Sequence, residues 1–149
     1  MKLDIGGEEK FDTNIEALWT ALNDPAVLVK KIEAGLQASL GHAISVIVRS
    51  LDQLRALTAS EPFQAIKVTP DTRLYVTFLA APTRSKSGLS IPYESPEKNL
   101  LILRVTKDEI FSVVDLGAGG STIDAMELIE KEFGKKVTTR NWNTIKKLT

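Results

Sequence analysis

Two apolar runs, Leu100–Thr106 and Ile110–Leu116, decide the fold of this chain, and only the polar triplet Lys107-Asp108-Glu109 separates them. Each run is short and rich in leucine, isoleucine and valine, which is typical of a buried strand. A connection this short joins two strands as a β-hairpin. The chain continues as Gly117-Ala118-Gly119-Gly120-Ser121-Thr122 into a segment with helical spacing. We therefore predict two strands, a glycine-rich turn and a helix in direct succession.

The helix after the turn has clear boundaries. Ser121 and Asp124 predict a capping box at its start, and Gly134 ends it. Its inner face is predicted from the spacing of Ile123, Met126, Ile129 and Phe133. On the other side of the hairpin, Thr72–Leu79 alternates well and predicts a third strand. Between that strand and the hairpin, Ala80–Pro96 has three prolines and little periodicity, and we predict a long loop that is either functional or mobile.

Toward the N-terminus, three further helices and one strand are predicted. Asn14 to Leu22 has one apolar helical face. Asp24-Pro25 starts a second helix, which Gly41 ends. Ile44–Arg49 is short and β-branched and predicts a strand. Ser50 and Gln53 predict a capping box for the helix that follows.

These elements predict an α+β protein with an antiparallel or mixed sheet and helices packed on one face. At 149 residues we expect one domain, 1–149. The alternative is a division into two lobes, a helix-rich truncated lobe at 1–70 and a C-terminal α+β lobe at 71–149.

The run Thr138-Thr139-Arg140-Asn141-Trp142-Asn143-Thr144 is the most distinctive in the chain. Trp142, Ile145 and Leu148 recur every three residues and predict one face of a short helix. Asn141 or Thr139 is the expected cap. One interpretation is a terminal helix that docks Trp142 into the core. The other is a binding site formed by Arg140, the asparagines and nearby lysines, because arginine and aromatic residues are frequent at interfaces.

The composition excludes several classes of protein. There is no cysteine, which excludes disulfides, thiolate metal sites and a cysteine nucleophile. No apolar run approaches the roughly 20 residues that span a bilayer, and the N-terminus is too polar for a secretory signal. We therefore expect a cytoplasmic protein with no membrane partner. The net charge is zero, but five basic residues and no acidic ones follow Gly134.

Four segments together resemble the family known as domain of unknown function 1697. They are Val46–Leu54, Pro62-Phe63, Val76–Leu79 and Thr138–Leu148. The resemblance runs from about Pro25 to Leu148. It implies ferredoxin-like, split β-α-β lobes and no assigned activity. Members usually open with Arg-Gly-Ile-Asn-Val-Gly-Gly, of which only Ile5-Gly6-Gly7 remains here. They also carry Arg-Ser-Lys where this chain has Gly120-Ser121-Thr122, so two positive charges are missing from the turn.

We expect a non-catalytic binding module for an anionic ligand, either nucleic acid or a nucleotide-like phosphate. A glycine-rich turn at a helix N-terminus can cradle an anion, although glycine is also the default where a turn needs positive φ. No catalytic set, metal site or cofactor motif is recognised. The expected ligand-binding residues are Lys135, Lys136, Arg140, Asn141, Asn143, Lys146 and Lys147, with Gly119, Gly120, Ser121 and Thr122 as an adjacent cradle.

Two other classes of function stay open. One is an enzyme of small phosphorylated substrates that uses the same glycine-rich turn. The other is a domain that associates with itself or with another protein. A missing first-lobe strand would expose a sheet edge, through which a homodimer could form.

Overall fold

A computed structural model describes residues 24–149 of the chain. They fall into two compact units, 24–48 and Arg49–Thr149, which we describe separately. The helix predicted between Asn14 and Leu22 lies outside the described residues.

The first unit contains one helix, α2, Pro25–Leu40. Its start and end are as predicted. The Asp24 side chain accepts a hydrogen bond from the backbone N–H of Ala26, and Pro25 occupies a position where its missing N–H costs nothing. At the other end, Gly41 adopts the left-handed conformation with φ 76°, and its N–H donates to the carbonyl of Gln37.

The predicted strand Ile44–Arg49 is wrong. Residues 43–50 follow no regular secondary structure and belong to no sheet. β-branched residues favour extended backbone, but a strand also needs a neighbour that completes its ladder of hydrogen bonds. Here the N–H of Val46 instead donates to the carboxylate of Glu33 at 2.8 Å.

The second unit begins with α3, Leu51–Ala59, whose capping box between Ser50 and Gln53 is confirmed. The remaining elements form a five-stranded sheet and two more helices. In chain order they are β1 Thr72–Leu79, β2 Tyr93–Glu94, β3 Leu100–Val105, β4 Glu109–Asp115, α4 Thr122–Phe133, β5 Val137–Asn141 and α5 Trp142–Leu148.

The strand order of the sheet is β2-β3-β4-β1-β5, and every neighbouring pair is antiparallel. Because β1 lies between β4 and β5, the β4–α4–β5 segment is a split β-α-β unit. In the same way β4 lies between β1 and β3, but the connection from β1 to β3 contains no helix. The α+β fold class is confirmed, with a ferredoxin-like sheet that carries a loop in place of one crossover helix.

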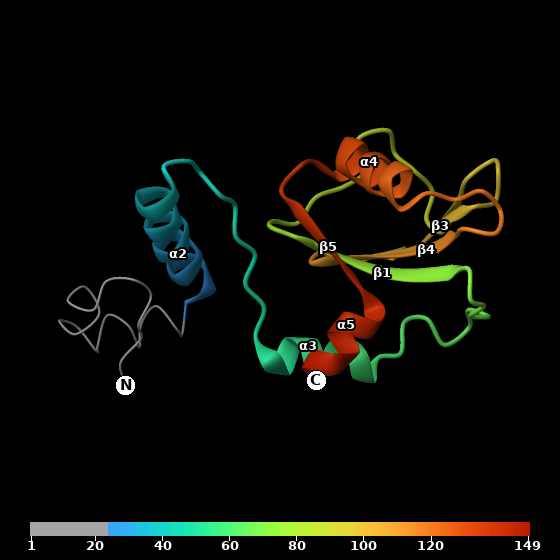
Figure 1. Cartoon of the computed structure of the whole chain (residues 1–149), viewed down its shortest axis with the longest axis horizontal. Coiled ribbons are helices and arrows are strands. Elements are labelled where there is room, and N and C mark those ends of the chain that lie inside the picture. The colour runs from blue at the N-terminus through green and yellow to red at the C-terminus, as the bar shows by residue number, and fades with distance from the viewer. Residues whose placement is uncertain (1–23) are drawn as a thin grey trace. The chain divides into compact units, whose positions relative to one another are not determined.

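Helix α4 packs on one face of this sheet (Figure 1). Ile129 and Phe133 of α4 contact Leu79, Ile102 and Ile110 from three different strands. Each side chain is at most 6 % exposed, so its burial stabilises the fold by about 1.5–3 kcal/mol.

Three aromatic residues form the core on the other face. The ring of Phe63 makes edge-to-face contacts with Phe111 at 5.9 Å and with Trp142 of α5 at 5.4 Å. Trp142 is only 6 % exposed, which confirms the interpretation that it docks in the core. Asn141 is confirmed as the cap of α5, whereas Leu148 is 58 % exposed and takes no part in that core.

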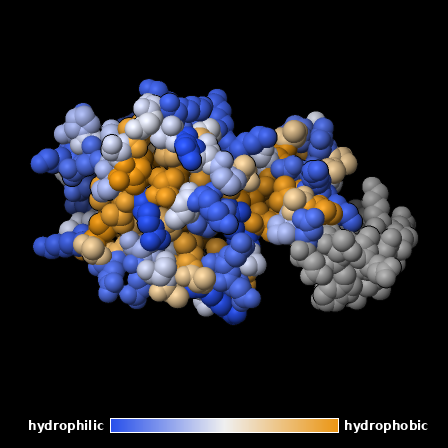
Figure 2. All heavy atoms as spheres, turned by 180° about the vertical axis from the view of Figure 1, so that it is seen from behind, coloured by the Kyte–Doolittle hydropathy of each residue, from blue (hydrophilic) through white to orange (hydrophobic). Residues whose placement is uncertain are grey.

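Seen from behind, hydrophobic residues gather on the surface of the sheet-bearing unit, with hydrophilic residues around them (Figure 2). Within residues 24–149, no helix combines the length and the apolar character needed to cross a membrane.

Candidate ligand-binding groove

Backbone hydrogen bonds bring three separate segments together at the C-terminal end of β1. The N–H of Leu79 donates to the carbonyl of Asp108 in the β3–β4 turn at 2.9 Å. The N–H of Ala80 donates to the carbonyl of Lys136 at the start of β5 at 3.1 Å. The Arg49 guanidinium also links these segments, because it donates hydrogen bonds to the carbonyls of Leu79 and Asp108 at 2.7 and 3.2 Å.

The loop that leaves this end of β1 is fixed to α4 by one carboxylate. Glu132 is 5 % exposed, and its Oε2 accepts hydrogen bonds from Ser85 Oγ at 2.6 Å, Ser87 Oγ at 2.8 Å and Ser87 N–H at 3.1 Å. The backbone carbonyl of Glu132 also accepts from the N–H of Lys86. Four bonds from residues 85–87 therefore set the course of the loop.

These bonds also change the acidity of Glu132. The hydroxyl of Ser85, followed by the N–H and hydroxyl of Ser87, lowers the pKa of Glu132 below its ordinary value of 4.5. Because the folded pKa is depressed, the carboxylate stabilises the fold above pH 4.5, and this stabilisation is lost as the pH falls through the folded pKa.

We therefore expect the free energy of unfolding of the wild type to fall with pH below about 4.5, and the Glu132→Gln variant to lose this part of the pH dependence. Denaturant unfolding at several pH values measures the free energy of unfolding of both proteins, with Glu127→Gln, at an exposed position, as the control. If the free energy of unfolding fell equally with pH in the wild type and in Glu132→Gln, a carboxylate held by the loop would be contradicted.

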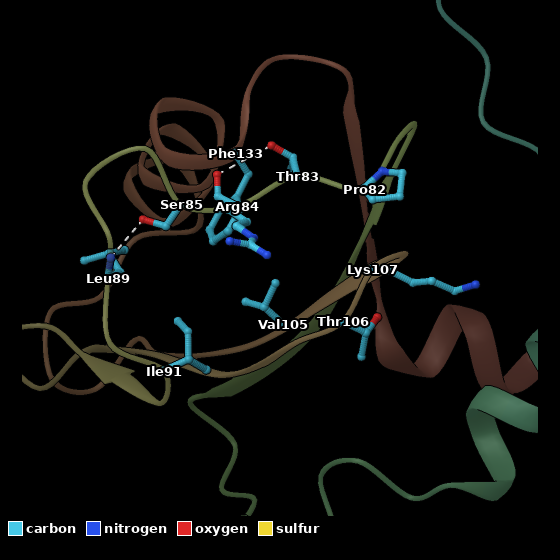
Figure 3. Close-up of a pocket in the computed structure, with 10 residues that line it drawn as sticks. All are labelled: Pro82, Thr83, Arg84, Ser85, Leu89, Ile91, Val105, Thr106, Lys107 and Phe133. Carbon is cyan, nitrogen blue, oxygen red and sulfur yellow. Dashed lines mark hydrogen bonds between the residues drawn. The ribbon is translucent and has the colours of Figure 1, made fainter.

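An open groove of about 640 Å³ lies between this loop, the end of β3 and the end of α4 (Figure 3). Half of the lining is apolar and consists of Pro82, Leu89, Ile91, Val105 and Phe133. The other half is polar and consists of Thr83, Arg84, Ser85, Thr106 and Lys107.

Some polar side chains of the groove already have hydrogen-bond partners within the protein, and others do not. Ser85 Oγ donates to Glu132 and accepts from the N–H of Leu89, and Thr106 Oγ1 donates to Glu109. The Arg84 guanidinium has no hydrogen bond or ion pair with any described residue and is directed toward Val105 (Figure 3). The Lys107 side chain is directed away from Val105, and its ammonium lies 3.8 Å from Asp108.

Two of the basic residues singled out from the sequence reach this end of the sheet. Lys135 and Lys136 are exposed and precede β5, whose Val137 pairs with Leu79. We call Arg84, Lys107, Lys135 and Lys136 the basic end of the sheet. Nearby, the carboxylate of Glu109 is paired with Arg49, that of Asp108 lies 3.8 Å from the ammonium of Lys107, and that of Glu132 is bonded to the loop serines.

The other C-terminal residues lie elsewhere. Arg140 pairs with Val76 and shares its face, which is the face opposite Tyr75 and α4. Its guanidinium donates to Thr138 Oγ1 and to the carbonyl of Thr139, on its own strand. The remaining four lie on or beside α5: Asn141 accepts from the N–H of Asn143, while Asn143, Lys146 and Lys147 are exposed.

The glycine-rich turn lies at the opposite end of β1, where Asp115 pairs with Thr72. The length of β1 puts it about 24 Å from the basic end, at roughly 3.4 Å per residue. Four of its donors are used internally. The N–H groups of Gly117 and Ala118 bond to the Asp115 carboxylate, and those of Gly119 and Gly120 bond to the carbonyls of Leu116 and Asp115. Ser121 caps α4 by accepting from the N–H of Asp124, and Thr122 Oγ1 lies 2.9 Å from the hydroxyl of Tyr75.

Sequence reasoning did not find the groove residues. The long loop Ala80–Pro96 was the available signal, because loops of this length in compact domains are often functional. Within it, the basic pair Arg84 and Lys86 flanks Ser85, but nothing in the sequence indicates that Val105 and Phe133 lie opposite.

The fold and the groove together define an α+β protein with a ferredoxin-like sheet and an open, partly basic groove at one sheet end. The family model described as Protein of unknown function (DUF1697) matches residues 16–111, which is more than half of the chain. The chain therefore belongs to this family. The match includes the loop and β3 of the groove, and it ends before α4 and the Thr138–Leu148 segment. No curated protein and no solved structure matches the chain.

Proposed function

We propose that this protein is a non-catalytic binding module for an anionic ligand, either nucleic acid or a phosphate-bearing small molecule, and that the basic end of the sheet holds the anion. The observation that carries the proposal is Arg84. Its guanidinium points into the groove and has no anionic partner among the described residues. An arginine fork can donate two parallel hydrogen bonds to a phosphate or carboxylate.

The positions of the neighbouring cations support the proposal. Lys107 and Lys136 belong to segments whose backbones bond to adjacent residues, Leu79 and Ala80. Such a cluster raises the local concentration of anions and their rate of association. The glycine-rich turn is a second, separate candidate, because about 24 Å lies between it and the basic end. A small ligand cannot contact both, whereas a nucleic acid can.

The decisive variant is Arg84→Ala. We expect it to weaken the binding of inorganic phosphate about 10- to 100-fold, which is the value of hydrogen bonds to charged groups. Arg55→Ala, at an exposed position on α3, is the matched control and should bind as wild type does. Isothermal titration or chemical-shift titration measures both. Equal binding by wild type and Arg84→Ala would refute an anion site at the basic end.

Salt dependence distinguishes nucleic acid from a small phosphate. If the four cations of the basic end neutralise four phosphates of a single strand, log K should fall with log salt at a slope of about −3. A single phosphate gives a slope of about −1 or shallower. No binding of a short single-stranded RNA or DNA near 50 mM salt would remove nucleic acid as the ligand.

A further inference from the structure

We propose that the ligand of the groove is a small amphiphilic anion, in which a phosphate or carboxylate head is joined to an aliphatic body. This inference rests on the proposed function, because the head occupies the anion site at Arg84. It goes further by assigning the rest of the ligand from the chemistry of the groove walls.

The apolar walls are aliphatic rather than aromatic. Leu89 and Ile91 come from the loop and Val105 from the end of β3, and together they face the space into which Arg84 points (Figure 3). The only aromatic lining residue is Phe133, which is 6 % exposed and packed in the core beneath α4. A nucleobase that stacks needs an exposed ring face, and the groove offers none. An alkyl chain needs only apolar contact.

The polar lining is unsuited to the edges of adenine and cytosine. Adenine is read by asparagine or glutamine, and cytosine by a carboxylate. None of these types lines the groove, and the hydroxyls of Ser85 and Thr106 are engaged with Glu132 and Glu109. Among the charged groups of the lining, the Arg84 guanidinium has no partner in the described part of the chain, and a guanidinium recognises an anionic head.

The anion site and the aliphatic wall of the groove also lie side by side. The Arg84 guanidinium is directed toward Val105, so an anion held there has the aliphatic wall within reach (Figure 3). The volume of about 640 Å³ falls within the 300–1,000 Å³ usual for small-molecule sites. Each methylene that becomes fully buried against the wall should strengthen binding about fourfold.

The test compares four probes on the full chain by isothermal titration, all below micellar concentration: inorganic phosphate, octyl phosphate, octanoate and adenosine monophosphate. We expect octyl phosphate to bind at least about tenfold more tightly than inorganic phosphate, because several methylenes are partly buried. Octanoate should bind detectably. Adenosine monophosphate should bind within about threefold of inorganic phosphate, since its base gains neither stacking nor hydrogen bonds.

Two variants locate the two parts of the ligand. Arg84→Gln should weaken octyl phosphate and octanoate at least about tenfold. Val105→Thr keeps the shape of the wall and adds a hydroxyl, so it should reduce the affinity for octyl phosphate relative to that for inorganic phosphate. Val113→Thr, on the half-buried opposite face of β4, is the matched control and should change neither.

The outcomes separate this inference from the function it rests on. Suppose that inorganic phosphate, octyl phosphate and adenosine monophosphate bind with equal affinity and all depend on Arg84. The proposal that the ligand has an aliphatic body is then overturned, and the proposal of an anion site at Arg84 is supported. If adenosine monophosphate binds most tightly, the inference is overturned in favour of a nucleotide. If no probe binds, or if Arg84→Gln binds octyl phosphate as wild type does, both the anion site and the inference are overturned.

Discussion

Replacing Trp142 by alanine is expected to lower the free energy of unfolding by about 3–5 kcal/mol, the range for deletion of a large buried aromatic side chain. The indole is 6 % exposed and packs edge-to-face on Phe63, which in turn packs on Phe111. Alanine would leave a cavity between α5 and the sheet and remove one aromatic pair from this core. Chemical denaturation followed by circular dichroism measures the loss.

The matched control for Trp142→Ala lies on the same helix. Leu148→Ala removes an apolar side chain that is 58 % exposed, so it should change the free energy of unfolding by less than about 0.5 kcal/mol. If Trp142→Ala cost less than about 1 kcal/mol, Trp142 would not be part of the core, and it would have to be considered again as a contact for a ligand or partner.

Gly120→Ala is expected to destabilise the second unit by about 1–3 kcal/mol or more, the cost of forcing an atom into a packed site. A Cβ at position 120 would lie 2.4 Å from the carbonyl oxygen of Asp115 and 2.8 Å from that of Asn99. Both are backbone atoms, and both accept hydrogen bonds that fix the turn: Gly120 N–H bonds to Asp115, and Asp115 N–H bonds to Asn99. Glycine is therefore required here for close approach, independently of any anion.

The neighbouring Gly117→Ala serves as the control for this effect. Its added Cβ would meet only side-chain atoms, those of Asp71 and Asp115, at 3.1 Å and beyond. Because side chains can shift by a few tenths of an ångström, the loss should stay below about 1 kcal/mol. Thermal unfolding measures the stability loss of each variant, and its repetition with phosphate tests whether the loss is independent of an anion. Equal stability losses in the two variants would contradict the packing role of Gly120.

The helices were predictable because their ends are marked locally. Asp24 with Pro25, the pair Ser50 and Gln53, and Ser121 with Gly134 satisfy or terminate hydrogen bonds within a few residues. The β3–β4 hairpin was predictable for a similar reason, since two buried apolar strands meet across a short polar turn. These signals depend on neighbours in the sequence and not on tertiary contacts.

Strand pairing was less predictable because it depends on distant partners. Ile44–Arg49 has the composition of a strand, yet within residues 24–149 it joins no strand ladder. Val137–Asn141 contains two threonines, an arginine and an asparagine, and we did not predict it as a strand. It nevertheless forms β5, because β1 offers it an edge and Thr77 Oγ1 lies 2.7 Å from Thr139 Oγ1.

The candidate site could be predicted from the sequence only in part. Lys135 and Lys136 were recognised as basic residues, and the loop Ala80–Pro96 as a segment of interest. Their meeting at one end of the sheet follows from the position of β1 between β4 and β5, which no local pattern reveals. Arg84 was overlooked because its significance depends on the groove beside it.

The central position of β1 also has a consequence for the order in which this unit can fold. Both neighbours of β1 follow it in the chain, β4 after a long connection and β5 only after α4. During synthesis β1 therefore leaves the ribosome before either partner exists, while β3 and β4 can pair as soon as their hairpin has emerged. Contacts between segments that are distant in the sequence slow folding. An apolar strand whose partner strands have not yet been made is prone to aggregation. Thr72–Leu79 is therefore the segment of the nascent sheet that stays unpaired on one edge until β5 has been made.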